Sequence, residues 1–171
     1  MTRGGDTAPA DPFADVNPTP HAVLAALTSE DWAQLRSLVD RMNAHSGSFG
    51  GWVAPEPIDE NSFSMGYSTM GPLLEESFNF IYDRKLILLG FAWMDWHAGD
   101  LLVNGETPPE WSALSLEVTL GMITAITRSD RFCEGALLKA FDDGTMPKLF
   151  ARLLDFAPSD GTSGTTARSC T

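Results

Sequence analysis

The sequence has few of the features that mark secreted, membrane-spanning or disulfide-bonded proteins. Only two cysteines, Cys133 and Cys170, occur among its 171 residues, so a structural disulfide is not expected. The chain does not open with a basic segment followed by an apolar run, and its longest apolar stretch, residues 86–94, is too short to span a bilayer. We therefore expect a soluble cytoplasmic protein without a membrane partner.

Basic residues are also scarce. The chain has 11 Lys and Arg against 23 Asp and Glu, which gives a net charge of −12. Nucleic-acid binding needs clustered positive charge, so nucleic acid is not expected as a partner. Residues 54–117 contain eleven acids and only two bases, whereas residues 118–156 contain five of each. This distribution predicts an acidic surface, which either only keeps the protein soluble or also docks a basic partner.

The signatures of common catalytic and metal sites are missing from the sequence too. It contains no glycine-rich phosphate loop, no nucleophile elbow and no paired-cysteine metal motif. The three histidines, His21, His45 and His97, lie too far apart in sequence for their spacing to indicate a metal site. We therefore expect no cofactor and no metal, and we assign no catalytic residue.

Hydrophobic periodicity predicts a mainly α fold, a compact bundle of about five helices. We expect it to occupy residues 21–157 as a single globular helical domain. Residues 1–20 are rich in proline and residues 158–171 in small polar side chains, so we expect both ends to be disordered tails.

Local start signals place the expected helices along the chain. One begins near Thr28 or Ser29 and one at Pro72, and others follow four capping residues: Asp95, Ser115, Asp130 and Thr145. Two short aromatic-bearing runs, residues 49–53 and 62–67, are expected to pair as a short β-hairpin near residues 48–67.

The densest group of charges lies at the expected junction between two helices. Arg128 would end one helix, Asp130 would cap the next, Arg131 would open it and Glu134 would follow one turn later. Two interpretations remain open. The group is either an Arg–carboxylate cluster that locks the two helices together or a site that binds an anionic ligand. Cys133 is expected inside this helix as a small core residue.

The run Arg128-x-Asp-Arg-Phe-Cys-Glu-Gly135, the following Leu137 and Gly144, and the Leu-rich last helix resemble an uncharacterised bacterial family, domain of unknown function 6508. The resemblance covers residues 48–156. It implies no activity, because the family has no established one. The family pattern usually places a His directly after the Gly, where this chain has Ala136, so no catalytic role is transferred to the motif.

A second group of candidates is aromatic. Trp52 and Tyr67, on the expected hairpin, either cover the core of the bundle or line a groove that serves as an interface. Asp95, Trp96 and His97 either frame a polar pocket or are a helix cap and surface side chains.

These observations favour a non-enzymatic binding or interaction module with an acidic surface. Its partner would be a protein with a basic surface, or a second copy of the chain in a homo-oligomer. The alternative is an enzyme or small-molecule binder that holds an anionic ligand at Arg128 and Arg131.

Overall fold

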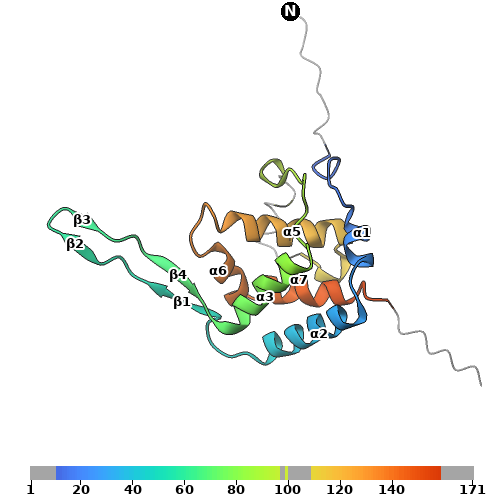
Figure 1. The fold of residues 1–171 in the computed structure, drawn as a ribbon, viewed down its shortest axis with the longest axis horizontal. Helices are drawn as coiled ribbons and strands as arrows, with labels where there is room; N and C mark the ends of the chain where they lie inside the picture. Colours follow the sequence, from blue (N-terminus) through green and yellow to red (C-terminus); the bar gives the residue numbers. More distant parts are fainter. Residues whose placement is uncertain (1–10, 97–98, 100–108, 159–171) are drawn as a thin grey trace, which may run out of the picture.

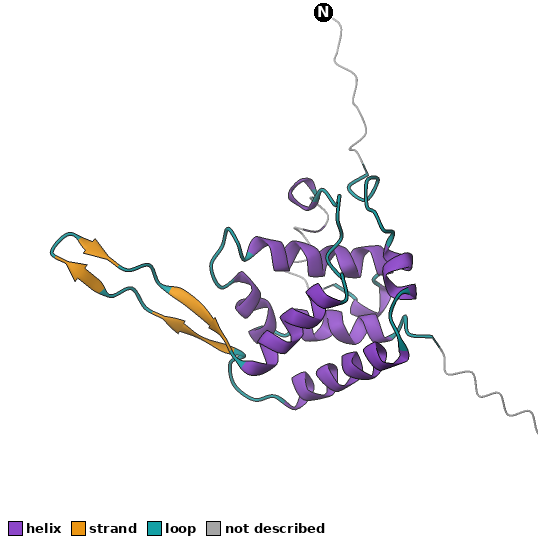
Figure 2. Cartoon of the chain, in the orientation of Figure 1, coloured by secondary structure: helices purple, strands orange, loops and turns teal. Residues whose placement is uncertain are grey.

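A computed structural model describes residues 11–96, Gly99 and residues 109–158. In this part of the chain, α-helices surround one hydrophobic core and a β-hairpin projects away from them (Figures 1 and 2). The helices are α1 (Pro20–Ala25), α2 (Ser29–Ala44), α3 (Pro72–Asp83), α5 (Leu116–Ser129), α6 (Ala136–Asp142) and α7 (Thr145–Leu154), with short 3₁₀ turns at Trp93–Asp95 (η1) and Trp111–Ala113 (η2). The prediction of a mainly α fold with a short hairpin is confirmed, with six α-helices rather than about five in the described residues. No helix within these residues is both long enough and apolar enough to cross a membrane.

Two of the predicted helix starts are built by side-chain caps. At the start of α2, the Thr28 hydroxyl accepts from the backbone N–H of Asp31 at 3.2 Å, and the Asp31 carboxylate accepts from the Thr28 N–H at 2.8 Å. This reciprocal pair is a capping box. The Ser115 hydroxyl caps α5 by accepting from the N–H of Val118 at 3.3 Å.

The helix predicted to begin after Asp130 begins later in the structure, so its predicted start is wrong. Residues 130–135 form a turn, and α6 begins only at Ala136. Gly135 precedes it with a φ of +83°, a conformation that strongly favours glycine and separates the turn from the helix. Arg131 is therefore not a first-turn residue, and Cys133 is exposed in the turn rather than buried in a helix.

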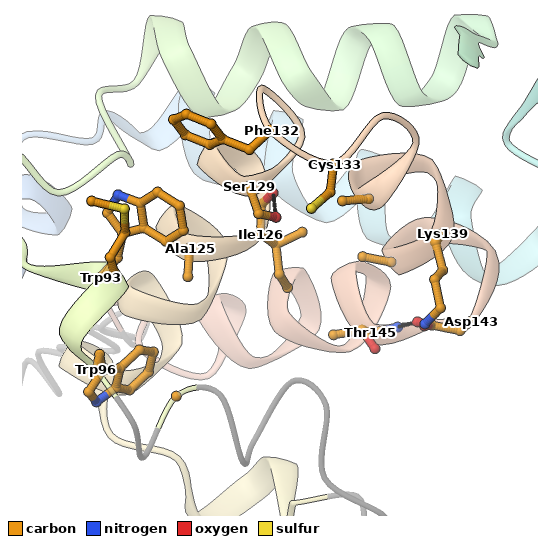
Figure 3. Close-up of a pocket in the computed structure, with 14 residues that line it drawn as sticks. Trp93, Trp96, Ala125, Ile126, Ser129, Phe132, Cys133, Lys139, Asp143 and Thr145 are labelled. Atoms are coloured by element: carbon orange, nitrogen blue, oxygen red, sulfur yellow. Dashed lines mark hydrogen bonds and ion pairs between the residues drawn. The ribbon is translucent and has the colours of Figure 1, made fainter. Parts of the chain in front are cut away.

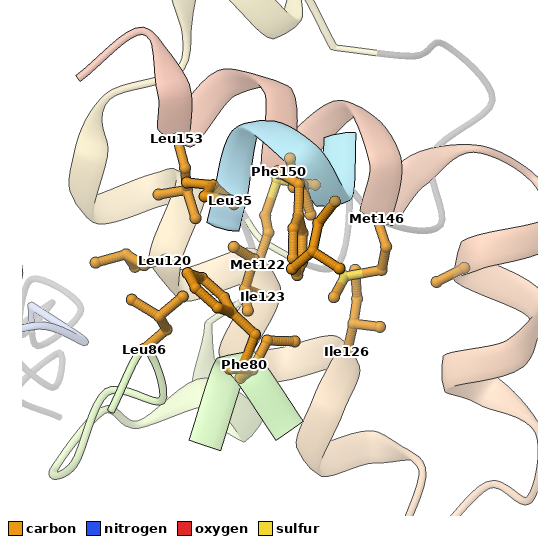
Figure 4. Packing of buried hydrophobic residues seen from close by; sticks show 14 of the residues in the cluster. Leu35, Phe80, Leu86, Leu120, Met122, Ile123, Ile126, Met146, Phe150 and Leu153 are labelled. Atoms are coloured by element: carbon orange, nitrogen blue, oxygen red, sulfur yellow. The ribbon is translucent and has the colours of Figure 1, made fainter. Parts of the chain in front are cut away.

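Helix α5 is the centre of the core. Its buried residues point in several directions, as expected of a helix that neighbours surround on most sides. Leu120 and Ile123 of α5 lie between Phe80 of α3, Phe150 of α7 and Leu35 of α2 (Figure 4). All five side chains are almost completely buried.

Residues 11–20, expected to belong to a disordered tail, instead pack on the helices. The ring of Phe13 stacks on Phe91 at 4.7 Å, and Val16 is buried. Phe13 also covers Gly121 of α5, where a Cβ atom would lie only 3.1 Å from the ring. Because Gly121 has no side chain, the ring of Phe13 can pack directly against α5. Residues 1–10 and 159–171 lie outside the described part of the chain.

The predicted hairpin exists, but it has two pairs of strands. Strand β1 (Gly50–Val53) pairs antiparallel with β4 (Tyr67–Met70), and β2 (Pro57–Asp59) pairs with β3 (Ser62–Phe63) nearer the tip. We call residues 50–70 the arm. The arm extends away from the helical body (Figure 1).

Most of the arm's aromatic side chains do not cover the core. Phe49, at the root, is only 8% exposed, but Trp52 is 57%, Phe63 65% and Tyr67 51% exposed. The interpretation of these residues as core aromatics is therefore wrong for the three beyond the root. Trp52 borders a hollow that Leu138 and Lys139 of α6 also line, yet its side chain stays more than half exposed, and Phe63 lies near the tip of the arm.

Candidate functional site

The root of the arm is held by two carboxylates. Glu134, in the turn before α6, accepts hydrogen bonds from the backbone N–H and the hydroxyl of Ser68 on β4, both at 2.7 Å. Asp142, at the end of α6, accepts from the N–H of Phe49 and the hydroxyl of Ser48, both at 2.8 Å. The two ends of α6 therefore anchor the two strands of the arm.

Glu134 is a hydrogen-bond acceptor for the arm and not a partner of an arginine. The backbone N–H of Ser68, and after it the Ser68 hydroxyl, lower the pKa of Glu134 from its usual value. Among the described residues, Glu134 forms no ion pair. The expected pairing with Arg131 fails because both residues lie in a turn, where a spacing of three residues does not align side chains on one face.

Asp130 also holds the backbone in place. Its carboxylate accepts from the N–H of Leu137 in the first turn of α6 at 2.9 Å, seven residues further along the chain. It serves as C-cap of α5 and satisfies a free N–H of α6 at the same time. The predicted Arg–carboxylate cluster is thus replaced by two carboxylates that each bind backbone N–H groups.

Arg128 and Arg131 line a groove of about 500 Å³ together with Lys85. Within the described residues, none of these three cations forms an ion pair. We call this hollow the basic groove; its other lining residues are Pro18, Tyr82, Ile87, Leu89, Trp93, Met94 and Phe132. Among the described residues no Asp or Glu lines it, so the charged side chains found there are all positive.

The apolar side chains of the basic groove are unusually open to solvent. Phe132 and Met94 are each 74% exposed, and Leu89 is 59% exposed. Phe132 is exposed because it lies in the turn before α6 and not in the helix. Its ring centroid lies 6.1 Å from that of Trp93.

A second hollow, of about 380 Å³, shares Tyr82 and Arg131 with the basic groove. It is lined by Met70, Phe78, Tyr82, Thr127, Asp130 and Arg131. The Thr127 hydroxyl is buried there and has no hydrogen-bond partner among the described residues. A buried hydroxyl without a partner is costly, so this position would gain from a polar ligand atom.

A third hollow, of about 620 Å³, lies beside the basic groove (Figure 3). Trp93, Met94 and Phe132 line both hollows. Lys139 and Asp143 pair at 3.1 Å at the far end, where Thr145 also lies.

The other predicted site residues are dispersed. Trp96 lines the third hollow and is largely buried, whereas Asp95 belongs to η1 and does not line it. His97 lies outside the described residues, so the predicted Asp95–His97 pocket stays a prediction. Trp52 and Tyr67 lie on the arm and line neither of the hollows that contain Arg128 or Arg131. Over the described residues, no three His, Cys, Asp or Glu side chains converge where they would hold a metal ion.

Sequence reasoning missed Lys85, Ser68 and Asp142. Lys85 follows the end of α3 with a φ of +54°, so the chain turns there and Lys85 lines the groove with Arg128 and Arg131. A signal for it existed in the Arg84-Lys85 pair. No local signal marks Asp142, because its partners lie more than ninety residues earlier in the chain.

Comparison with known proteins identifies a family and nothing more specific. The model of the "Family of unknown function (DUF6508)" matches residues 27–159. The chain therefore belongs to this family, in agreement with the resemblance noted in its sequence. Neither the curated proteins nor the solved structures contain a match to it.

Proposed function

We propose that this member of the DUF6508 family is a protein-interaction module and that the arm is the element that binds the partner. The observation that carries the proposal is the exposure of five large apolar side chains on one projecting hairpin: Trp52, Ile58, Phe63, Met65 and Tyr67, each between 51% and 87% exposed. Exposed large apolar side chains that gather on one element are typical of interaction surfaces, where Trp and Tyr are enriched.

The anchoring of the arm supports this function. A two-stranded hairpin alone is marginally stable in water, so a free arm would lose much of its binding energy to ordering. Glu134 holds the β4 side of the root and Asp142 holds the β1 side. The arm is therefore presented in one orientation, which lowers the entropic cost of docking.

The charge of the arm indicates the kind of partner. Glu56, Asp59 and Glu60 are its charged residues, and it contains no Lys or Arg. A partner that covers the apolar side chains would also have to pair with these acids, so its surface would be basic.

Charge reversal on the arm tests the proposal. Asp59→Lys is expected to reduce recovery of a co-purifying polypeptide or of a homo-oligomer, measured by native mass spectrometry on protein from its own host. The control is Asp40→Lys, which makes the same change of charge at an exposed residue of α2, away from the arm. Melting temperatures of both variants should stay near that of the parent. Equal recovery with Asp59→Lys and Asp40→Lys would contradict the proposal.

A second candidate function is the binding of a small anionic ligand in the basic groove. It is favoured by the three cations of the groove, which form no ion pair among the described residues. Arg131 also lines the neighbouring hollow that contains the Thr127 hydroxyl, which has no hydrogen-bond partner among the described residues. Arg131→Ala should then abolish a thermal shift produced by inorganic phosphate while the unliganded protein keeps its fold. Phosphate that shifts neither the parent nor the variant would remove this candidate.

A further inference from the structure

We infer that the arm of one copy docks in the basic groove of a second copy, so that the protein forms a dimer by exchange of arms. This inference rests on the proposed interaction function of the arm and names its partner as another molecule of the same chain.

The first argument is the distribution of exposed apolar side chains. Over the described residues, the large exposed ones lie in two places. Those of the arm are Trp52, Ile58, Phe63, Met65, Tyr67 and, at its root, Met70; the others are Tyr82, Leu89, Met94 and Phe132. The last four all line the basic groove. The molecule therefore carries one projecting apolar element and one hollow apolar surface.

The second argument is charge. The arm has three acids and no base, and the described residues that line the groove include three bases and no acid. Among the described residues, Glu56 and Glu60 of the arm form no ion pair, and neither do Arg128 and Arg131 of the groove. Docking between two copies would pair the acids of the arm with the bases of the groove.

The third argument is reach. From Gly50 to Glu60 the arm is long enough to extend roughly 30 Å at the usual rise of a strand. It points away from its own helices (Figures 1 and 2), so its acids lie far from the helical body that carries its own groove. A neighbouring molecule is the place where the tip of the arm can meet such a groove. In a two-fold dimer each copy gives one arm and one groove, so both surfaces are covered and the assembly closes.

The openness of the groove favours the arm over a small molecule. Small-ligand sites usually bury most of their ligand inside a cleft. Here Phe132, Met94 and Leu89 are all more than half exposed around the cations. A macromolecular surface can cover all three, whereas a phosphate ion held by Arg128 and Arg131 would leave them in water.

Matched charge reversals test the exchange in the full-length protein. One variant carries Asp59→Lys and Glu60→Lys on the arm, and the other carries Arg128→Glu and Arg131→Glu in the groove. Sedimentation velocity should show a dimer for the parent and a dissociation constant roughly ten-fold or more weaker for each variant alone. An equimolar mixture of the two variants should recover a dimer, because both of its contacts again join opposite charges: the reversed arm meets the reversed groove, and the native arm meets the native groove. Recovery would also show that both variants are folded.

Other outcomes overturn the inference in distinguishable ways. A parent that is monomeric at every concentration contradicts arm exchange, and phosphate binding by that monomer would assign the groove to a small anion. A dimer that neither variant weakens contradicts it as well, since another face would then form the contact. If the monomeric parent still recovers a host polypeptide that Asp59→Lys loses, this inference fails and the proposed function stands. If the arm variants alter neither mass nor recovery, both fail.

Discussion

At the scale of single residues, the carboxylates of the turn before α6 organise the structure around the candidate site. Asp130 binds the N–H of Leu137, and Glu134 binds Ser68 on the arm. Arg128 and Arg131, which alternate with them in sequence, form no ion pair among the described residues and line the basic groove. The motif thus combines residues that shape the backbone with residues available for binding.

Glu134→Ala should loosen the root of the arm. The variant loses the carboxylate oxygen that accepts both hydrogen bonds from Ser68, so the amide hydrogen of Ser68 is expected to exchange faster with solvent than in the parent. Hydrogen exchange followed by NMR measures this directly. Glu60→Ala, near the tip of the arm, removes an equal charge and should leave exchange at Ser68 unchanged. Equal exchange rates in the parent and in Glu134→Ala would show that Glu134 does not hold the arm.

The same anchor should depend on acid pH. Hydrogen bonds from Ser68 lower the pKa of Glu134, so its folded-state pKa lies below the ordinary value of about 4.3. A lowered pKa stabilises the anchored state fully above the ordinary value, and the contribution is lost as pH falls through the lower one. Protection of the Ser68 amide should therefore be constant from neutral pH down to about 4.3 and decrease below it. Glu134→Gln should remove this decrease.

Lys85 is expected to reduce stability where it stands. It occupies the left-handed position after α3, with Leu86 donating to the carbonyl of Ile81 and Lys85 to that of Tyr82, as in a Schellman motif. Lys85→Gly should raise the free energy of unfolding by about 0.5–1 kcal/mol, since relief of the backbone strain exceeds the entropy that glycine adds to the unfolded chain. Denaturant titration of the parent and the variant measures this difference in the free energy of unfolding. Lys85→Ala removes the same charge without relieving the strain, so it should give no such gain.

At the scale of elements, the boundary between the 130–135 turn and α6 separates two phenylalanines that have similar local sequence signals. Phe141 in α6 is 1% exposed, and Phe132 in the turn is 74% exposed. Phe141→Ala is expected to cost about 3–5 kcal/mol because it leaves a cavity in the core. Phe132→Ala should change stability by less than about 0.5 kcal/mol. Chemical denaturation compares the free energies of unfolding of the two variants. Equal losses of stability would contradict the boundary between the 130–135 turn and α6.

The elements that the sequence predicts well are those whose signals are local. The capping box at Thr28, the Ser115 cap and the proline at the start of α3 all act within one turn, so the starts of α2, α3 and α5 follow from them. The start of α6 cannot be predicted in this way. In sequence Asp130 resembles an ordinary N-cap, and only the structure shows that its carboxylate binds the N–H of Leu137, seven residues later.

The arm and the N-terminal segment show the same limit over longer distances. The strands of the arm were recognisable as aromatic runs, but their exposure depends on where the helices lie. The bonds that anchor the arm join residues 66 and 94 positions apart. Phe13 is partly buried against Gly121, a residue more than one hundred positions later that leaves room for its ring. Of the candidate site, Arg128 and Arg131 were named from sequence, while Lys85 and the apolar lining required the fold.

At the scale of the whole molecule, the net charge of −12 conceals a separation of charge. The acids of the arm lie on its projecting hairpin, and Lys85, Arg128 and Arg131 meet in one groove of the helical body. A strongly acidic protein would normally repel its own copies. The separation gives two copies a way to attract each other in one orientation while the remaining surface keeps them apart.

Arm exchange therefore predicts a dimer that salt weakens. Exposed charge pairs are screened as ionic strength rises, so the dissociation constant should increase between about 0.05 M and about 0.5 M salt. Trp52→Ala removes apolar area from the arm and no charge. It should weaken the dimer at every salt concentration and leave the slope against salt unchanged. The variant with Arg128→Glu and Arg131→Glu should flatten or reverse that slope, because the groove then repels the arm at low salt. Sedimentation velocity across the salt series gives all three slopes. A parent dimer that strengthens with salt would show that apolar contact alone holds it and that the charges of the arm and groove do not meet.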